Sequence, residues 1–169
     1  MDSVVITPGG SQTTTVSLAV SPSGTDADAG MDSLTYQIRW YRSDTLVGAL
    51  NDQTTFPAAY TNKSDNVFCA VRVWDGTVYS AWLWSNNVSI VNTVPVVSNL
   101  IIVPSSPYYV DDLAFQCTFV DNDGTAVVPV NIRWYRNGTL MAEYNNLTQI
   151  PHTALHEYDV WRVVVQPSG

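Results

Sequence analysis

Charged residues are scarce in this sequence, and cations are the scarcest of them. Fifteen Asp and Glu stand against seven Lys and Arg, which gives a net charge of −8 at pH 7, and Lys63 is the only lysine. Binding to a nucleic-acid backbone requires clustered cations that release counterions. An anionic membrane surface attracts the same groups. The balance therefore argues against nucleic acid and against an anionic membrane as partners.

Long apolar runs and catalytic motifs are also missing. No run approaches the ~18 apolar residues of a membrane span, so direct membrane insertion is not expected. His152 and His156 are the only histidines. There is no Gly-Xaa-Ser-Xaa-Gly elbow, no Cys-Xaa-Xaa-Cys or His-Glu-Xaa-Xaa-His pair and no glycine-rich phosphate loop. The sequence predicts no enzyme. A hydrolase using paired carboxylates such as Asp111 and Asp112 is the remaining catalytic alternative.

An internal repeat organises the chain. Ile38-Arg39-Trp40-Tyr41-Arg42 recurs 94 positions later as Ile132-Arg133-Trp134-Tyr135-Arg136, and five further identities downstream keep the same register. A period of this length exceeds a solenoid repeat and suits one β-sandwich. The sequence predicts two homologous domains, residues 1–92 and 93–169, joined by a short linker that contains Pro95.

Each copy contains short segments of alternating hydrophobicity between turn signals, and no segment has sustained helical periodicity. In the first copy we expect strands at residues 13–20, 35–42, 67–74 and 78–91. Trp40 and Trp134 share the face of Ile38 and Ile132, so both indoles are predicted to be core anchors. A ligand-stacking role for either is the alternative.

The order of these motifs, with Asp-Gly turns around an Ile-Arg-Trp-Tyr-Arg strand, resembles the immunoglobulin-like repeats of large archaeal and bacterial surface and secreted proteins. PKD-type and cadherin-type sandwiches are similar in outline. The resemblance covers nearly the whole chain. It implies an all-β fold of two tandem immunoglobulin-like β-sandwich domains, with roles as spacers, adhesive stalks and filament components.

The two cysteines depart from that pattern, because related domains often carry a pair that bridges two strands within one domain. Cys69 belongs to the first copy and Cys117 to the second. A bridge would require Cα atoms within about 7 Å, although the two residues belong to different cores. We expect two buried, unpaired thiols that pack as small hydrophobes.

The second copy reaches the turn Pro167-Ser168-Gly169 without a counterpart of the closing strand at 78–91. Two interpretations stay open: the chain is a piece of a longer protein, or a strand donated by another subunit completes the domain.

Acidic residues gather in two equivalent turns, at Asp26 and Asp28 and at Asp121 and Asp123. Alternate carboxylates in a tight turn can aim several oxygens at calcium, a hard cation. Aspartates also occupy turns because their side chains bond nearby backbone amides. The sequence predicts either no cofactor or calcium at these turns.

Sequons for N-glycosylation occur in or beside turns, at Asn62, Asn87, Asn137 and Asn146.

The stretch 79–84 is aromatic on both faces of a predicted strand, so one face should cover the core and the other should be partly exposed. Trp82 and Trp84 are therefore candidates for packing against a neighbour or for stacking on sugar rings. Contact with the adjacent domain or a loop is the alternative. Arg39 and Tyr41, and likewise Arg133 and Tyr135, are expected to form stacked surface pairs.

Together these features predict a non-catalytic structural module of an extracellular or cell-surface assembly, whose partners are neighbouring domains or copies of itself. The alternative is an adhesive module that binds surface glycans or proteins.

Overall fold

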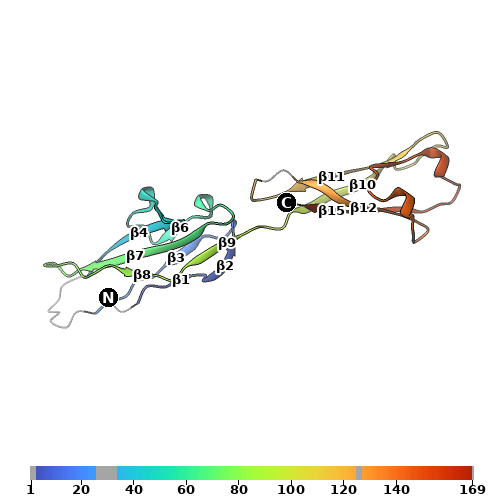
Figure 1. The fold of residues 1–169 in the computed structure, drawn as a ribbon. Helices are drawn as coiled ribbons and strands as arrows, with labels where there is room; N and C mark the ends of the chain where they lie inside the picture. The colour runs from blue at the N-terminus through green and yellow to red at the C-terminus, as the bar shows by residue number, and fades with distance from the viewer. Residues whose placement is uncertain (1–2, 26–33, 125–126, 169) are drawn as a thin grey trace. The chain divides into compact units, whose positions relative to one another are not determined.

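The computed structural model describes residues 3–25, 34–124 and 127–168, and the chain divides into two compact units (Figure 1). Unit 1 is Met1–Thr93 and unit 2 is Val94–Gly169. Both are all-β, and the helices of the described residues are 3-10 turns of three residues each. None of those helices is long and apolar enough to cross a membrane. The predicted fold class, tandem immunoglobulin-like β-sandwiches, is confirmed.

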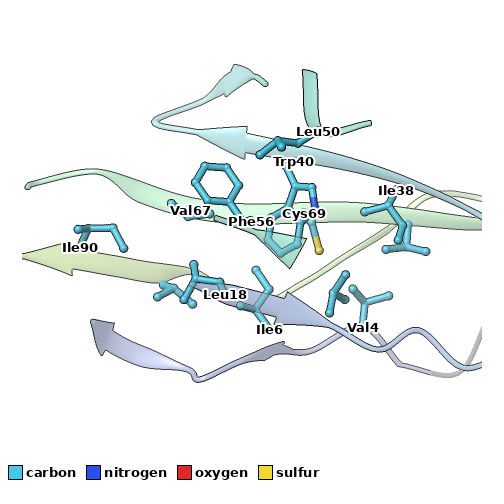
Figure 2. Close-up of a cluster of buried hydrophobic side chains, with 13 residues drawn as sticks. Val4, Ile6, Leu18, Ile38, Trp40, Leu50, Phe56, Val67, Cys69 and Ile90 are labelled. Atoms are coloured by element: carbon cyan, nitrogen blue, oxygen red, sulfur yellow. The ribbon is translucent and has the colours of Figure 1, made fainter. Parts of the chain in front are cut away.

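Unit 1 buries its core between two sheets (Figure 2). One sheet has the order β1-β3-β6 and the other the order β2-β9-β7-β4-β5, with β8 also paired to β7. The strands are β1 Ile6–Thr7, β2 Gly10–Thr13, β3 Leu18–Val20, β4 Thr35–Arg42, β5 Thr45–Leu46, β6 Thr55–Phe56, β7 Asn66–Trp74, β8 Leu83–Trp84 and β9 Val88–Val91. The 3-10 turns are η1 Gly48–Leu50 and η2 Ala58–Tyr60.

Unit 2 has two three-stranded sheets, in the orders β10-β11-β14 and β13-β12-β15. Its strands are β10 Val96–Val103, β11 Leu113–Val120, β12 Val128–Arg136, β13 Thr139–Leu140, β14 Gln149–Ile150 and β15 Trp161–Ser168, with the 3-10 turns η3 Ala142–Tyr144 and η4 His152–Ala154. Within the described part of unit 2, no strand takes the places of β2, β8 and β9. Within the described residues, β15 is paired with β12 on one side and has no strand on the other, as expected for a domain without its closing strand.

The 94-residue offset of the sequence repeat is kept in the strand register. Trp40 lies opposite Cys69 in the β4–β7 pair, and Trp134 lies opposite Val163 in the β12–β15 pair. The turns η3 and η4 follow η1 and η2 at the same spacing. The repeat therefore preserves the pairing of the central strands as well as their sequence.

Trp40 and Trp134 are fully buried in the cores of their units, at 0% exposure. Each indole N–H donates to a backbone carbonyl thirteen residues later: Trp40 to Gln53 at 2.8 Å and Trp134 to Leu147 at 2.9 Å. A buried Trp removes about 150–250 Å² from water, and its N–H needs a partner there. In Figure 2 the Trp40 ring lies with Phe56 and Cys69 between the sheets.

The single strand expected at residues 13–20 is two strands in different sheets. β2 pairs parallel with β9, whereas β3 pairs antiparallel with β1. Between them a turn is closed by the Val16 N–H, which donates to the Thr13 carbonyl at 3.2 Å. Polar and apolar residues continue to alternate across this turn, and the sequence pattern therefore did not reveal the break between the two strands.

The two cysteines are free thiols with different surroundings. Cys69 is completely buried, and this burial raises the pKa of its thiol to about 11 against a hydrogen bond with Ser85 that lowers it. Cys117, on β11, is only half-buried, which corrects the expectation of two buried thiols. The reason is that unit 2 covers its core less completely than unit 1.

Candidate interaction face

The outer surface of the larger sheet of unit 1 carries most of the exposed aromatic side chains of that unit. Strand alternation turns Ile38 and Trp40 inward, and it places Arg39 and Tyr41 on the opposite face of β4. Neighbouring positions on β7 bring Phe68 to the same face. Residues 80–85, which follow Tyr79, pack on the same face, where Trp82 contacts Arg39 and Trp84 contacts Tyr41. We call this surface the aromatic face.

Tyr41, Phe68 and Trp84 form the more open part of the aromatic face. Tyr41 stacks on Phe68 with centroids 5.2 Å apart and planes 6° from parallel. Trp84 is tilted against both rings, at 5.3 Å from Tyr41 and 5.7 Å from Phe68. The Trp84 side chain is still 55% exposed. An exposed indole held in place by two rings offers a rigid apolar platform for a neighbour or a sugar ring.

Trp82 lies in a different setting, because two guanidinium groups cover it. Arg39 is 4.6 Å and Arg72 is 4.7 Å from the ring centroid. Arg72 also lies 3.9 Å from the Tyr79 ring, and its Nε donates to Gln37 at 2.8 Å. Each cation–π contact at a surface contributes about 0.5–1 kcal/mol. The Trp82 ring therefore braces the sheet and has less free surface than Trp84.

Two serines attach the segment 80–85 to β7. The Ser80 hydroxyl accepts the Val73 N–H at 3.0 Å, and the Ser85 hydroxyl accepts the Cys69 N–H at 2.9 Å. These bonds satisfy edge N–H groups of β7 on either side of the two-residue strand β8. The segment is thus fixed although little of it is regular strand.

The continuous closing strand expected at 78–91 is divided into β8 and β9. The expectation that one face of residues 79–84 covers the core is wrong, because none of these residues belongs to the core cluster of unit 1. The core is filled by Val88 and Ile90 of β9. The aromatic alternation reflects packing on the outer face of the sheet instead.

The Arg–Tyr pairs predicted within single strands do not form. Arg39 packs on Trp82, and Tyr41 packs on Phe68. In unit 2 the guanidinium over Tyr135 belongs to Arg162 of the neighbouring strand, at 4.8 Å, while Arg133 Nε donates to Asn131. Side chains on adjacent strands are closer than residues i and i+2 of one strand, so rings and cations stack across strands.

All four sequon asparagines are exposed, but they differ in how their side chains are used. Asn137 donates its Nδ2 to Asp159 at 2.9 Å and accepts the Val160 N–H at 2.8 Å. Asn146 accepts the Ile132 N–H at 3.1 Å. The side-chain amides of Asn62 and Asn87 make no hydrogen bond within the described residues. Glycosylation remains a prediction for all four, and we expect it most readily at Asn62 and Asn87.

The acidic turns are only partly within the described residues, since Asp26 and Asp28 lie outside them. At the other turn the Asp121 Oδ1 accepts the Asp123 N–H at 2.8 Å, which is local turn chemistry. The Asp121 Oδ2 is buried without a partner in the part of the chain that the structure describes. No group of three or more metal-ligating side chains gathers in that same part. Calcium remains an untested prediction at Asp121 and Asp123.

Comparisons with known proteins give no family for the chain. No protein-family model matches the sequence, and no curated protein sequence matches it. Among solved structures, the chain is similar to the FN1–FN3 domains of chicken CNTN1, with 10% identity, a TM-score of 0.34 and coverage of 99% of this chain and 61% of that one. It thus spans less than two thirds of that structure. It is also similar to the fibronectin(III)-like modules of Clostridium thermocellum CbhA, with 12% identity, a TM-score of 0.28 and coverage of 97% and 85%.

Proposed function

We propose that this chain is a non-catalytic structural module of an extracellular cell-surface or filament assembly. The observation that carries the proposal is the duplication itself. Two β-sandwich units, each built around its own buried Trp, follow one another with residues 92–95 between their strands. Repetition of self-contained units is how a chain gains reach without enlarging a single core.

The polar contacts support a structural task as well. His152 and Asp112 form a close acid–base pair: the His152 backbone N–H donates to Asp112 Oδ1 at 2.7 Å, and the His152 Nδ1 lies 2.9 Å from the same oxygen. In unit 1 the equivalent contact joins the Ala58 N–H to the Ser17 hydroxyl at 3.0 Å. Because a serine performs the same task there, the pair serves to hold η4 against β11.

Immunogold electron microscopy of native material, with an antibody raised against this chain, tests the proposal. We expect gold particles on the cell envelope, on filaments or in secreted material. Label confined to the cytoplasm would overturn the proposal. Intact-mass measurement of the native protein is the companion experiment, because added glycan mass at Asn62 or Asn87 requires passage through a secretory compartment.

A second candidate function, adhesion through the aromatic face, is favoured by the exposed ring of Trp84. Glycan arrays and surface-protein pull-downs should give a signal that Trp84→Ala removes while the melting temperature stays nearly unchanged. Trp82→Ala is the matched comparison, because Trp82 is held between Arg39 and Arg72 and its loss should lower stability. Equal signals for wild type and Trp84→Ala would exclude this face as the binding site.

A further inference from the structure

Unit 1 carries two arginines on the aromatic face that have no acidic partner. Arg39 and Arg72 stack on the Trp82 ring, and neither forms an ion pair with a carboxylate in the described part of the chain. Arg42 on the same strand as Arg39 is different, since its Nε lies 3.8 Å from the Asp65 Oδ2. In a chain with fifteen acidic and seven basic residues, a pair of cations without a carboxylate is a local exception.

The guanidinium groups of both arginines keep unused hydrogen-bond donors. A guanidinium presents several N–H donors in one fixed plane, a fork that matches the oxygens of a carboxylate. Arg72 uses its Nε, which donates to the Gln37 Oε1 at 2.8 Å. Arg39 makes no hydrogen bond within the described residues, and its side chain is exposed. The remaining donors are available to an acceptor that arrives from solution.

Neighbouring side chains hold the two guanidinium groups in place. Both lie against Trp82, and Arg72 also lies against Tyr79. The Gln37 side chain, which accepts from Arg72, donates its own Nε2 to the Tyr79 hydroxyl at 3.3 Å. A cation fixed in this way loses less conformational entropy on binding a ligand than a mobile surface arginine does.

The strand register joins these arginines to the exposed ring of Trp84. Ala70 on β7 lies opposite Arg39 on one side and opposite Trp84 on the other. Its methyl group points to the outer face by alternation, yet Ala70 is only 2% exposed, so larger neighbouring side chains cover it. Adjacent strands are about 4.8 Å apart, which puts the backbones of Arg39 and Trp84 about 10 Å apart. The cations and the exposed indole therefore belong to one continuous surface.

A small polar cavity opens beside Arg39. It has a volume of about 90 Å³, and its lining consists of Gln37, Ile38, Arg39, Asn51, Asp52 and Trp82. Asp52 Oδ1 accepts the Ile38 N–H at 2.9 Å, and Asp52 forms no ion pair with Arg39 in the described chain. A water molecule takes about 30 Å³ in the liquid, so the cavity suits a substituent such as a hydroxyl and is too small for a whole ring.

Two properties of this surface favour a sugar over a peptide. In the sheet order β4 lies between β7 and β5, and β7 lies between β9 and β4, so the face presents side chains and no open strand edge. The cavity also has the Asp52 carboxylate in the same lining as Arg39. Its occupant therefore needs hydroxyl donors as well as an anionic group. A uronic acid carries both on one ring, whereas an ionised acidic side chain brings acceptors alone.

We propose that the aromatic face of unit 1 binds an acidic polysaccharide built of uronic acids. One sugar ring stacks on Trp84. A carboxylate is held by the guanidinium groups of Arg39 and Arg72, and a ring hydroxyl donates to Asp52. The stacked ring supplies contact area, and the charge-assisted hydrogen bonds select the acid. A pair of arginines suits the single carboxylate of a uronate, whereas a nucleic-acid backbone requires a larger cluster of cations.

This inference rests on the adhesive candidate function and names its ligand, and the structural role proposed above does not depend on it. The test is calorimetric titration of the full chain with oligomers of galacturonate, guluronate and glucuronate, each compared with its methyl ester. The ester keeps the rings and most hydroxyls and removes the negative charge. We expect saturable binding of at least one acid and about tenfold weaker binding of its ester.

Three results would overturn the proposal. Binding of none of the acids would exclude the ligand class and leave the immunogold test of the structural role untouched. Equal binding of an acid and its ester would keep the adhesive candidate and remove the role of the arginines. Polyglutamate that binds as tightly as the best uronate would identify the occupant as an acidic peptide.

Arginine variants locate the carboxylate. Arg39→Gln and Arg72→Gln should each weaken binding of the uronate about tenfold, because each removes charge-assisted hydrogen bonds. Arg39→Lys keeps the charge without the planar fork and should fall between Arg39→Gln and wild type. Arg42→Gln is the matched control, since Arg42 lies on the same strand and pairs with Asp65. Equal losses from Arg39→Gln and Arg42→Gln would contradict the assignment.

Asp52→Asn distinguishes a sugar from a simple anion. The variant keeps an oxygen for the Ile38 N–H and removes the negative charge from the cavity. Loss of the carboxylate acceptor should weaken uronate binding several-fold, because a sugar hydroxyl loses its partner. An anion held by charge alone would bind more tightly once the negative charge is removed. Tighter binding of the uronate to Asp52→Asn would therefore overturn the proposed contact.

Discussion

Unit 1 and unit 2 share a central register but differ in how completely their cores are covered. Cys69 and Val71 are fully buried on β7, whereas their counterparts Val163 and Val165 on β15 keep 7% and 8% exposure. Ile102, the counterpart of the buried Ile6, is only half-buried. The difference follows residues 80–91 of unit 1, the closing segment, which pairs with β7 and has no counterpart among the described residues of unit 2.

The parts that the two units share lie close together in the chain. The indole hydrogen bond of each core Trp and the two 3-10 turns recur with the same spacing. All of them are formed within residues 40–60 of unit 1 and residues 134–154 of unit 2. The comparison teaches that the Trp hydrogen bond and the two turns are specified locally, whereas full coverage of the core in unit 1 depends on residues 80–91, which follow them in the chain.

Replacement of the core tryptophans should have the largest effect. Trp40→Ala removes a fully buried ring, and such changes cost about 3–5 kcal/mol. Trp134→Ala should cost less within that range, because the half-buried Phe115, whose ring lies 6.3 Å from that of Trp134, can relax into the cavity. Urea unfolding followed separately for each unit measures both losses.

Each tryptophan variant is the control for the other, since the transition of the unmutated unit should not move. A larger loss from Trp134→Ala than from Trp40→Ala would contradict the view that the core of unit 2 is the more loosely covered of the two.

A smaller effect is expected from a side-chain acceptor that both units use. Asp52 accepts the Ile38 N–H at 2.9 Å, and Asn146 accepts the Ile132 N–H at 3.1 Å. Both have positive φ, 62° and 63°, so glycine removes the acceptor without adding backbone strain. Asp52→Gly and Asn146→Gly should each lose about 1–3 kcal/mol.

Asp52→Asn, which keeps the acceptor oxygen, is the conservative control and should be close to wild type in thermal unfolding. Unequal losses for the two glycine variants would show that this contact depends on the closing segment. That result would contradict the view that the contacts shared by the two units are specified locally.

The sequence allowed the fold class, the repeat and the strands 35–42 and 67–74 to be predicted, because these depend on alternation and on a duplicated motif. The division of 13–20 could not be predicted, because the alternation of polar and apolar residues continues across the break. The division of 78–91 falls at the polar run Ser85-Asn86-Asn87, a turn signal that the prediction of one continuous strand did not use. The candidate face was found from its aromatic composition. That Trp82 is covered by Arg39 and Arg72 follows from cross-strand neighbours, which a linear pattern does not contain.

The reactivity of the two thiols should distinguish unit 1 from unit 2 in the folded chain. Burial raises the pKa of Cys69 to about 11 from an ordinary 9.0, whereas Cys117 is half-buried with its pKa raised as well. Since the thiolate is the reactive form, iodoacetamide at pH 8 should modify Cys117 first and Cys69 only in denaturant. Peptide mass spectrometry over time measures the order. Faster modification of Cys69 would contradict the burial described for unit 1.

The smallest effect is expected at acid pH, and it concerns unit 2 alone. The His152 backbone N–H and then its side chain hold the pKa of Asp112 below its ordinary value of 3.8. A carboxyl whose folded pKa is lowered stabilises the protein above the ordinary pKa, and this contribution is lost as the pH falls through the folded value. Asp112→Ser introduces the residue type that unit 1 has at Ser17. Because serine does not titrate in this range, the stability of unit 2 should fall less steeply below pH 4 in the variant than in wild type. The effect is small because Asp112 and His152 are both exposed and screened by solvent.

Thermal melts of wild type and Asp112→Ser between pH 2 and pH 6 measure the difference. Unit 1 is the internal control. It should respond identically in both proteins, because its own Asp75, whose pKa is lowered by the Val78 and Thr77 N–H groups, is unchanged. An identical acid response of unit 2 in the variant would show that Asp112 is not what distinguishes the two units at low pH.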